Sequence, residues 1–126
     1  MKVDEEVRKE LVANLKGYVE RLAESLNEYI EKIKKAETVE EIMKIKQNLL
    51  LFYLGMTPLT TEHCYFCIAA KGKNGYPNCK KCLYAVHHGE CGYQNSDWSK
   101  IMRRILEVMD FIRDFYYKGE RYDHVE

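Results

Sequence analysis

Apolar residues recur every three or four positions over residues 4–35, and charged residues occupy most of the positions between them. This spacing places the apolar side chains on one face of an α-helix. Acidic residues open the segment and lysines close it, which is the arrangement that the helix dipole stabilises. The pattern predicts a first long helix, whose apolar face consists of Val7, Leu11, Leu15, Tyr18, Leu22, Leu26, Tyr29 and Ile33.

A second helix is predicted to begin directly after Thr38. Thr38 and Glu41 have the spacing of a capping box, in which a hydroxyl and a carboxylate accept hydrogen bonds from exposed backbone N–H groups. Gly55 and Pro58 mark its end. Because only a few residues connect the first two helices, we expect them to be antiparallel neighbours. The apolar positions of this helix are Ile42, Ile45, Leu49, Phe52 and Tyr53.

The periodicity stops over residues 57–96 and returns in a third helix. Ser96 or Asp97 can cap that helix, which is expected to run to about Lys118. Its apolar positions are Ile101, Ile105, Val108, Ile112 and Phe115. The sequence therefore predicts an all-α protein, a single domain over residues 1–126 in which a bundle of three long helices carries a small Cys-rich insert over residues 57–96.

All five cysteines lie in this insert, and four of them form two C-x2-C pairs. Two such pairs with a loop between them supply the four thiolates of a tetrahedral zinc site, and a site closed in this way is structural. Residues three apart share a face of a helical turn, so each pair is expected to lie on one turn with both sulfurs on the same side. The predicted ligands of a structural Zn²⁺ ion that staples the insert are Cys64, Cys67, Cys79 and Cys82.

Several alternatives to this ligand set and to zinc stay open. Cys91 could replace one of the four cysteines, and His88 is a further substitute, as are His63 and His87. Four cysteines also suit an iron–sulfur cluster. Two disulfides with one free thiol would staple the insert equally well. A dithiol redox role is the least favoured alternative, because the thioredoxin-type C-x2-C motif opens a helix after a strand, and no strand is predicted here.

Composition and charge indicate which partners and which cellular location to expect for the protein. The chain has twenty basic and twenty acidic residues, so it offers no overall field that would attract nucleic acid or an anionic membrane. Its longest apolar run is far shorter than the roughly 20 residues that a bilayer requires. We therefore expect a cytoplasmic protein with no membrane partner. Lysine and glutamate are abundant and glutamine occurs only twice, a balance typical of proteins from hot environments, where intracellular disulfides also occur.

The insert carries the only local excess of positive charge. Between residues 63 and 96 four lysines stand against a single acidic residue, Glu90. Lysines mixed with aromatic residues such as Tyr76 are typical of surfaces that bind single-stranded nucleic acid. The same lysines could instead bind an acidic protein, or balance the negative charge of zinc-bound thiolates. The candidate nucleic-acid-binding residues are Lys71, Lys73, Tyr76, Lys80 and Lys81.

No motif in the chain predicts catalysis. We find no Gly-rich phosphate loop, no H-E-x-x-H helix and no Ser–His–Asp grouping in the sequence. The sequence therefore predicts a non-enzymatic, metal-binding protein that binds nucleic acid or another protein. The first predicted helix would be about 45 Å long, at roughly 1.5 Å per residue, which is longer than such a domain needs. A homodimer through this helix is therefore a further hypothesis. In the corresponding alternative function, the protein is a disulfide-stapled, thermostable helical assembly protein.

The stretch from Cys64 to Trp98 resembles a group of small, largely uncharacterised Cys-rich proteins from prokaryotes and their phages. The resemblance is carried by the two C-x2-C pairs, followed by His88-Gly89-Glu90-Cys91 and then by Ser96-Asp97-Trp98. Those proteins often have proline directly after the second pair, where this chain has Leu83. The resemblance implies that all five cysteines form one unit, and it suggests a viral or mobile-element protein. It implies no reaction.

Overall fold

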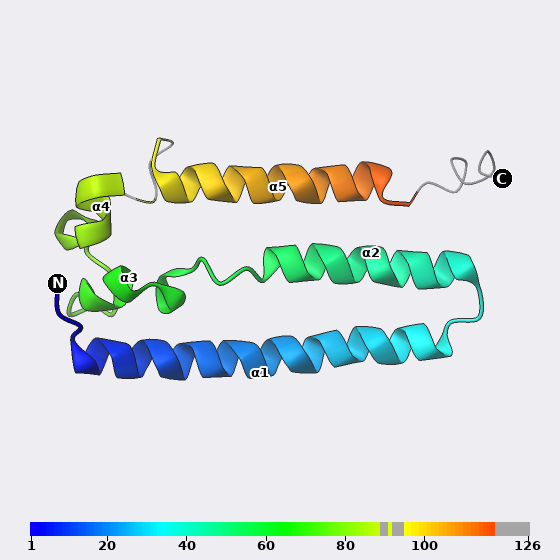
Figure 1. Ribbon diagram of the computed structural model, residues 1–126, viewed down its shortest axis with the longest axis horizontal. Helices are drawn as coiled ribbons and strands as arrows, with labels where there is room; N and C mark the ends of the chain where they lie inside the picture. The colour runs from blue at the N-terminus through cyan, green and yellow to red at the C-terminus, as the bar shows by residue number, and fades with distance from the viewer. Residues whose placement is uncertain (89–90, 92–94, 118–126) are drawn as a thin grey trace. The chain divides into compact units, whose positions relative to one another are not determined.

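The protein is mostly helical. The computed structural model describes residues 1–88, 91 and 95–117, with the side chains of residues 86–88 left out (Figure 1). These residues contain no β-strand, and an isolated bridge joins Lys71 and Pro77. The prediction of an all-α protein is therefore confirmed. The elements are α1 (Glu5–Lys35), α2 (Val39–Gly55), the 3₁₀ turn η1 (Thr61–His63), α3 (Tyr65–Ala69), the 3₁₀ turn η2 (Cys79–Lys81), α4 (Leu83–His88) and α5 (Asp97–Phe115).

Capping residues fix the starts of α1 and α2. The Asp4 carboxylate accepts from the Glu6 N–H at 2.9 Å at the start of α1. Thr38 Oγ1 accepts from the Glu41 N–H at 3.1 Å at the start of α2, as the capping box predicts. The Glu41 carboxylate accepts from the Glu37 N–H at 3.0 Å, one residue earlier than in the standard form of the box. The predicted end of the third helix, Lys118, lies outside the described residues.

The chain divides into two compact units. The first unit contains Met1–Glu20 and Pro58–Arg103, and therefore almost the whole predicted insert. The second unit contains Arg21–Thr57 and the chain from Arg104 onwards. The single domain over residues 1–126 and the insert over 57–96 stay predictions. No helix within the described ranges combines the length and the apolar character that crossing a bilayer requires.

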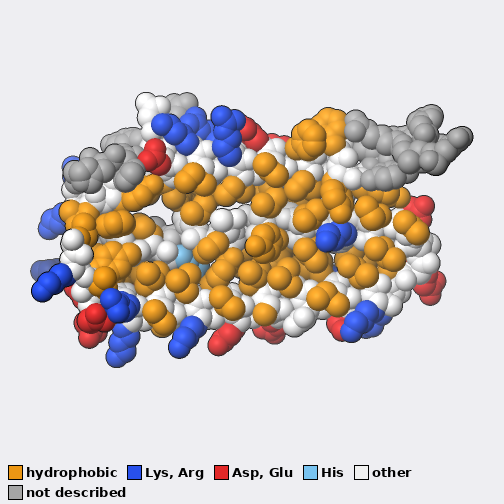
Figure 2. All heavy atoms as spheres, viewed as in Figure 1, with side chains coloured by type: hydrophobic (Ala, Val, Ile, Leu, Met, Phe, Trp, Pro, Cys, Tyr) orange, Lys and Arg blue, Asp and Glu red, His pale blue; other side chains and the backbone are white. Residues whose placement is uncertain are grey.

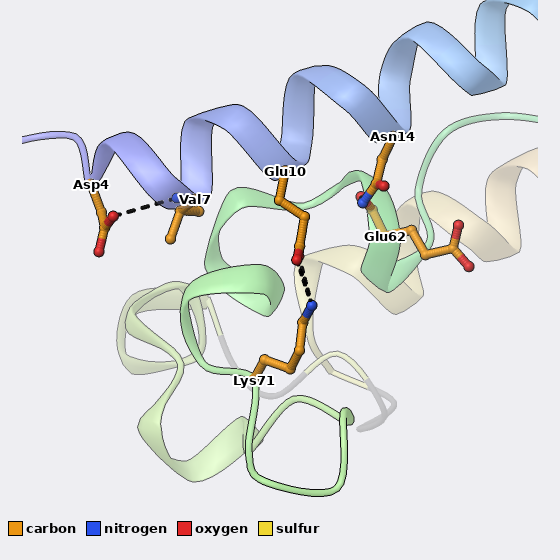
Figure 3. Close-up of polar contacts among 6 residues, drawn as sticks. All are labelled: Asp4, Val7, Glu10, Asn14, Glu62 and Lys71. Atoms are coloured by element: carbon orange, nitrogen blue, oxygen red, sulfur yellow. Dashed lines mark hydrogen bonds and ion pairs between the residues drawn. The ribbon is translucent and has the colours of Figure 1, made fainter.

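In the first unit, the start of α1 is tied to the segment that follows Pro58. Figure 3 shows that side chains of α1 face this segment. Tyr18 of α1 also meets the ring of His63 edge to face, with 5.1 Å between the ring centres. These contacts hold the cysteine-containing segment against one helix. The polar contacts are Asp4 N–H to Tyr65 Oη at 2.8 Å, Lys71 Nζ to the Glu10 carboxylate at 2.7 and 2.8 Å, and Asn14 Nδ2 to the Glu62 carbonyl at 2.9 Å.

In the second unit, α2 contacts both of the other helices. The rings of Tyr29 and Phe52 lie 5.6 Å apart, which joins α1 to α2. The Gln47 side-chain amide donates to the Ile112 carbonyl at 2.9 Å, which joins α2 to α5. A side chain at Gly55 would lie against Met109 of α5, 3.7 Å from its terminal methyl group. The end of α2 thus packs on α5.

Few side chains are fully buried. Among the described residues the buried hydrophobic side chains are Val7, Tyr18, Ile68 and Cys82, and all four lie in the first unit. The eight predicted core positions of α1 are all buried or half-buried. Hydrophobic side chains also reach the surface, as Figure 2 shows in orange. Because the buried core is so small, one additional stabilising bond has a large effect on the free energy of unfolding.

The apolar residues of α5 divide between two neighbouring faces. Ile105 and Ile112 are half-buried, whereas Ile101, Val108 and Phe115 are 47%, 49% and 42% exposed. The half-buried face is completed by residues seven apart in the chain, Met102, Met109 and Tyr116. The inner face of α5 is therefore rotated with respect to the apolar positions that the sequence analysis named.

Candidate metal centre and basic groove

Each C-x2-C pair lies on one helical turn. Cys64 directly precedes α3, and its carbonyl accepts from the Ile68 N–H at 3.1 Å. The thiol of Cys64 lies close enough to that of Cys67 to raise its pKa. The second pair spans η2, in which the Cys82 N–H donates to the Cys79 carbonyl at 3.3 Å. Each pair thus spans a single turn, as predicted, whereas the placement of both sulfurs on one side of each turn stays a prediction.

The two pairs occupy different positions in a repeated local structure. Both Cys64 and Cys82 are single extended residues that join a 3₁₀ turn to a short α-helix, with φ and ψ of −116° and 120° at Cys64 and −75° and 121° at Cys82. The partner of Cys64, Cys67, lies in the following helix. The partner of Cys82, Cys79, lies in the preceding turn. The pairs are thus shifted by three residues, and Cys64 corresponds to Cys82.

Cys91 is fixed through its backbone to the start of α5. Its carbonyl accepts from Ser96 Oγ at 3.0 Å and from Ser99 Oγ at 2.7 Å. Ser96 Oγ also accepts from the Ser99 N–H at 3.1 Å, so Ser96 is the N-cap of α5. Ser96 is only 1% exposed. The sequence predicted either Ser96 or Asp97 as the cap, and the bond of Ser96 to Cys91 depends on folding.

Trp98 ties the same end of α5 to a distant part of the first unit. Its indole Nε1 donates to the Leu59 carbonyl at 2.6 Å. Leu59 lies just before η1, and the first cysteine pair follows directly after this turn. Hydrogen bonds from the Ser96-Asp97-Trp98 segment therefore reach both Cys91 and the chain that leads to Cys64. This gives the segment a structural role in holding the cysteine-containing part of the chain.

The five thiols form one group, which we call the cysteine cluster: Cys64, Cys67, Cys79, Cys82 and Cys91. Burial, together with smaller effects of the nearby Cys64, Cys82 and Cys91, raises the pKa of Cys67 to about 12. Burial also raises the pKa of Cys91, with smaller contributions from Cys64, Cys82 and Cys79. Every member of the cluster thus lies close enough to another to affect its ionisation.

The cluster has the donors of a metal site but not its final geometry. All five cysteines are free thiols. In the part of the chain that the structure describes, no group of three or more His, Cys, Asp and Glu side chains is arranged to hold a metal ion. His88 ends α4, and its side chain lies outside the described residues, as does that of His87. His63 is turned toward Thr60, whose Oγ1 lies 2.9 Å from its Nδ1.

A tight loop separates the two cysteine pairs and forms one wall of a groove. The Gly72 N–H donates to the Tyr76 carbonyl at 2.8 Å, and the Asn78 N–H donates to the Ala70 carbonyl at 2.8 Å. Gly75 has φ +83°, which favours glycine. The loop and η2 enclose an open groove of about 450 Å³, which we call the basic groove. Its lining residues are Gly72, Asn74, Tyr76, Pro77, Asn78, Cys79 and Lys80.

The candidate nucleic-acid-binding residues do not all lie in one place. Tyr76 and Lys80 line the basic groove, and Tyr76 is 73% exposed. Lys71 points away toward α1, where it forms the ion pair with Glu10 seen in Figure 3. Lys81 lines a separate hollow of about 230 Å³ next to Phe66. With other described residues, Lys73, Lys80 and Lys81 form no ion pair.

Comparisons with protein-family models, with curated proteins and with solved structures find no match to this chain. The function is therefore inferred from the side chains of the first unit, namely the cysteine cluster and the lysines around the basic groove.

Proposed function

We propose that the protein is a non-enzymatic binding module, in which the cysteine cluster holds a structural zinc ion and the basic groove binds single-stranded nucleic acid. In this proposal the helices form a bundle, and the metal staples the Cys-rich segment to it. The observation that carries the proposal is the gathering of five thiols from three separate stretches of the first unit into one cluster.

The small buried core supports a structural role for the metal. The cysteine-containing segment consists of short helices and loops, and Ile68 and Cys82 are its buried hydrophobic residues within the described ranges. A bound zinc ion contributes directly to folding in such segments. Without a metal, the raised pKa values of Cys67 and Cys91 keep both thiols protonated at neutral pH. A bound cation reverses this effect and stabilises the thiolates.

The same properties favour structure over catalysis. Four thiolates close the coordination sphere of zinc, so no position is left for a substrate. Catalytic cysteines instead require a thiol pKa below its ordinary value. The pKa values of Cys67 and Cys91 are shifted in the opposite direction. Both observations support a role in holding the fold.

Elemental analysis of the purified full-length protein, together with a thiol count in denaturant, tests the metal. We expect one zinc ion per chain and five titratable thiols. Iron together with absorbance in the visible range would indicate an iron–sulfur cluster instead of zinc. No metal and a single free thiol would mean two disulfides, and would contradict the proposal.

The lysines near the basic groove support binding to nucleic acid. Lys80 lines a groove in which the exposed ring of Tyr76 can stack on a base. Lys73 and Lys81 are neighbours in sequence of residues that line this groove and add two further positive charges. Stacking combined with phosphate contacts is the usual basis of binding to single strands. Three contacts give weak and salt-sensitive binding. An acidic protein is the alternative partner.

Filter retention of labelled single-stranded DNA at several salt concentrations tests this part. We expect that changing Lys73, Lys80 and Lys81 to Glu abolishes retention, because these lysines would contact the phosphates. For the unmodified protein, the logarithm of the binding constant should fall with the logarithm of the salt concentration with a slope of about −2, since each of three contacts contributes roughly −0.7. The matched control changes the exposed Lys9, Lys44 and Lys46 to Glu and should keep retention. Equal retention by both triple variants would contradict binding at the groove.

We further propose a homodimer through α1 as a second candidate function. Val12, Val19 and Ile30 of this helix are 43%, 59% and 46% exposed. They lie seven and eleven residues apart, which places them on one helical face. A second copy of the helix would bury this face, as in an isologous dimer.

A further inference from the structure

The two asparagines that line the basic groove are both held by their side-chain carbonyl oxygens. Asn74 Oδ1 accepts from the Tyr76 N–H at 3.1 Å, and Asn78 Oδ1 accepts from the Lys80 N–H at 3.1 Å. Because a backbone N–H donates only to an acceptor, each bond fixes which end of the amide is the oxygen. No hydrogen bond among the described residues uses the NH2 group of either asparagine. Both side chains are exposed, so their NH2 groups are available to a ligand.

Backbone hydrogen bonds engage most of the acceptors along the groove. Four of its lining residues accept a backbone N–H at their carbonyl oxygens, at 2.8 to 3.3 Å: Gly72, Tyr76, Asn78 and Cys79. The described residues that line the groove include no Asp or Glu. Lys80 adds an ammonium group, which only donates. The side chains of the groove therefore offer a ligand mainly hydrogen-bond donors.

The loop between the cysteine pairs holds these donors in place. The Asn78 N–H donates to the Ala70 carbonyl at 2.8 Å, and this bond closes the loop. A Cβ atom at Gly72 would lie 3.3 Å from Asn74 Oδ1, so this oxygen is turned toward the backbone of the loop. A site whose groups are fixed in advance loses less freedom when a ligand binds.

Nucleic-acid bases differ in the groups that their edges present to such donors. Thymine and uracil carry the carbonyl oxygens O2 and O4, which accept, and they have no exocyclic amino group. Cytosine carries an amino group in place of O4. An amino group that faces an asparagine NH2 leaves two donors without an acceptor, which costs binding free energy. A groove lined by donors therefore favours the carbonyl edge of thymine or uracil over the amino edge of cytosine.

We infer that Asn74 and Asn78 give the basic groove a preference for thymine or uracil, by donating to the carbonyl edge of a base that stacks on Tyr76. This inference rests on the proposed binding of single-stranded nucleic acid and adds a base preference to it. The lysines contact phosphates and carry no sequence information, whereas contacts to base edges do. The ratio of affinities for two strands of equal length therefore isolates the contribution of the asparagines.

Fluorescence anisotropy of labelled oligomers of equal length, with the unmodified full-length protein at low salt, tests the inference. We expect oligo-dT to bind at least about 5-fold more tightly than oligo-dC, and oligo-rU more tightly than oligo-rC by the same factor, because one additional hydrogen bond contributes about that much. Equal or tighter binding of the cytosine strands would overturn the inference and leave the proposed function intact. Uracil lacks the methyl group of thymine, so a preference for oligo-dT without one for oligo-rU would trace the effect to that methyl group and would also overturn it. Absence of binding to all of these strands would instead remove the proposed function itself.

Substitutions that keep the turns of the loop but change the donors give a second readout through the same ratio. A serine hydroxyl can accept the backbone N–H that each asparagine accepts, and it both donates and accepts, so it tolerates either base edge. The double variant Asn74→Ser with Asn78→Ser should therefore lose the preference for oligo-dT. Asn78→Asp keeps the oxygen and replaces the NH2 group by a second acceptor, so the ratio should shift toward oligo-dC, whose amino group a carboxylate accepts.

The matched control is Asn27→Ser, at an exposed asparagine of α1 in the second unit. It should leave the ratio of affinities unchanged. The same ratio in the double variant as in this control would overturn the role of the two groove asparagines.

Discussion

Ser96 shows how a single side chain can connect a helix to the cysteine cluster. It caps α5 by accepting from the Ser99 N–H, and it donates to the Cys91 carbonyl. It is also the most deeply buried side chain among the described residues. Its hydroxyl therefore serves both the stability of α5 and the position of a candidate metal ligand.

Replacing Ser96 with Ala should reduce both the stability of the protein and its affinity for zinc. Loss of the cap costs about 1 kcal/mol, and loss of the bond to Cys91 adds about 1 kcal/mol, so urea unfolding should show a loss of about 2 kcal/mol. Zinc affinity should fall roughly tenfold, as for other contacts that orient a ligand. The control is Thr38→Ala, which removes the cap of α2 in the other unit. It should lower stability by about 1 kcal/mol and leave zinc affinity unchanged. Equal zinc affinity in both variants would contradict the role of Ser96.

At the scale of single elements, the long helices could be predicted because their apolar positions repeat over many turns. The inner face of α5 could not be predicted, because two stripes of apolar residues along it are equally regular. One stripe is Ile101, Val108 and Phe115, and the other is Met102, Met109 and Tyr116. Packing decides between two such stripes, and periodicity does not. The position of Cys91 relative to the pairs was also beyond reach, because it depends on serines that follow it by five and eight residues. The C-x2-C spacing, in contrast, correctly indicated one helical turn for each pair.

The exposed face of α1 leads to a prediction about assembly. If α1 pairs with a second copy, Val19→Glu should convert the dimer to a monomer in size-exclusion chromatography with light scattering. Removing one valine from each copy costs about 3 kcal/mol in total, which weakens association roughly 100-fold. The matched control is Val39→Glu on α2, at a valine that is 68% exposed. A wild-type protein that stays monomeric at high concentration would exclude this dimer.

At the scale of the whole molecule, the division into two units predicts that removal of the proposed metal should affect one unit first. The cysteine cluster lies entirely within the first unit. The second unit is joined by contacts such as Tyr29 with Phe52 and Gln47 with Ile112, none of which involves a cysteine. We therefore expect the metal to contribute stability mainly to the first unit.

The stability of the first unit should also depend on pH, because the thiol of Cys67 holds its proton differently in the folded and unfolded states. In the metal-free protein, folding raises the pKa of Cys67 from 9.0 to about 12, so the folded state holds its proton more tightly than the unfolded state. The resulting stability is fully present below about pH 9 and is lost as the pH rises toward about 12. Urea unfolding with a chelator and a phosphine reductant should show the onset of this loss between about pH 9 and about pH 10. The zinc-loaded protein should show less of it, because its thiolates are already deprotonated. Identical pH dependence with and without zinc would contradict metal binding by Cys67.

The contact between Trp98 and the Leu59 carbonyl provides an internal optical probe. Trp98 is the only tryptophan in the chain, it is half-buried, and both partners belong to the first unit. Its emission spectrum should therefore respond to events in the part of the protein that carries the cysteines. Melting of the second unit should be seen by circular dichroism with little change in tryptophan emission. Tryptophan emission thus reports on the first unit, whereas circular dichroism reports on the helices of both units.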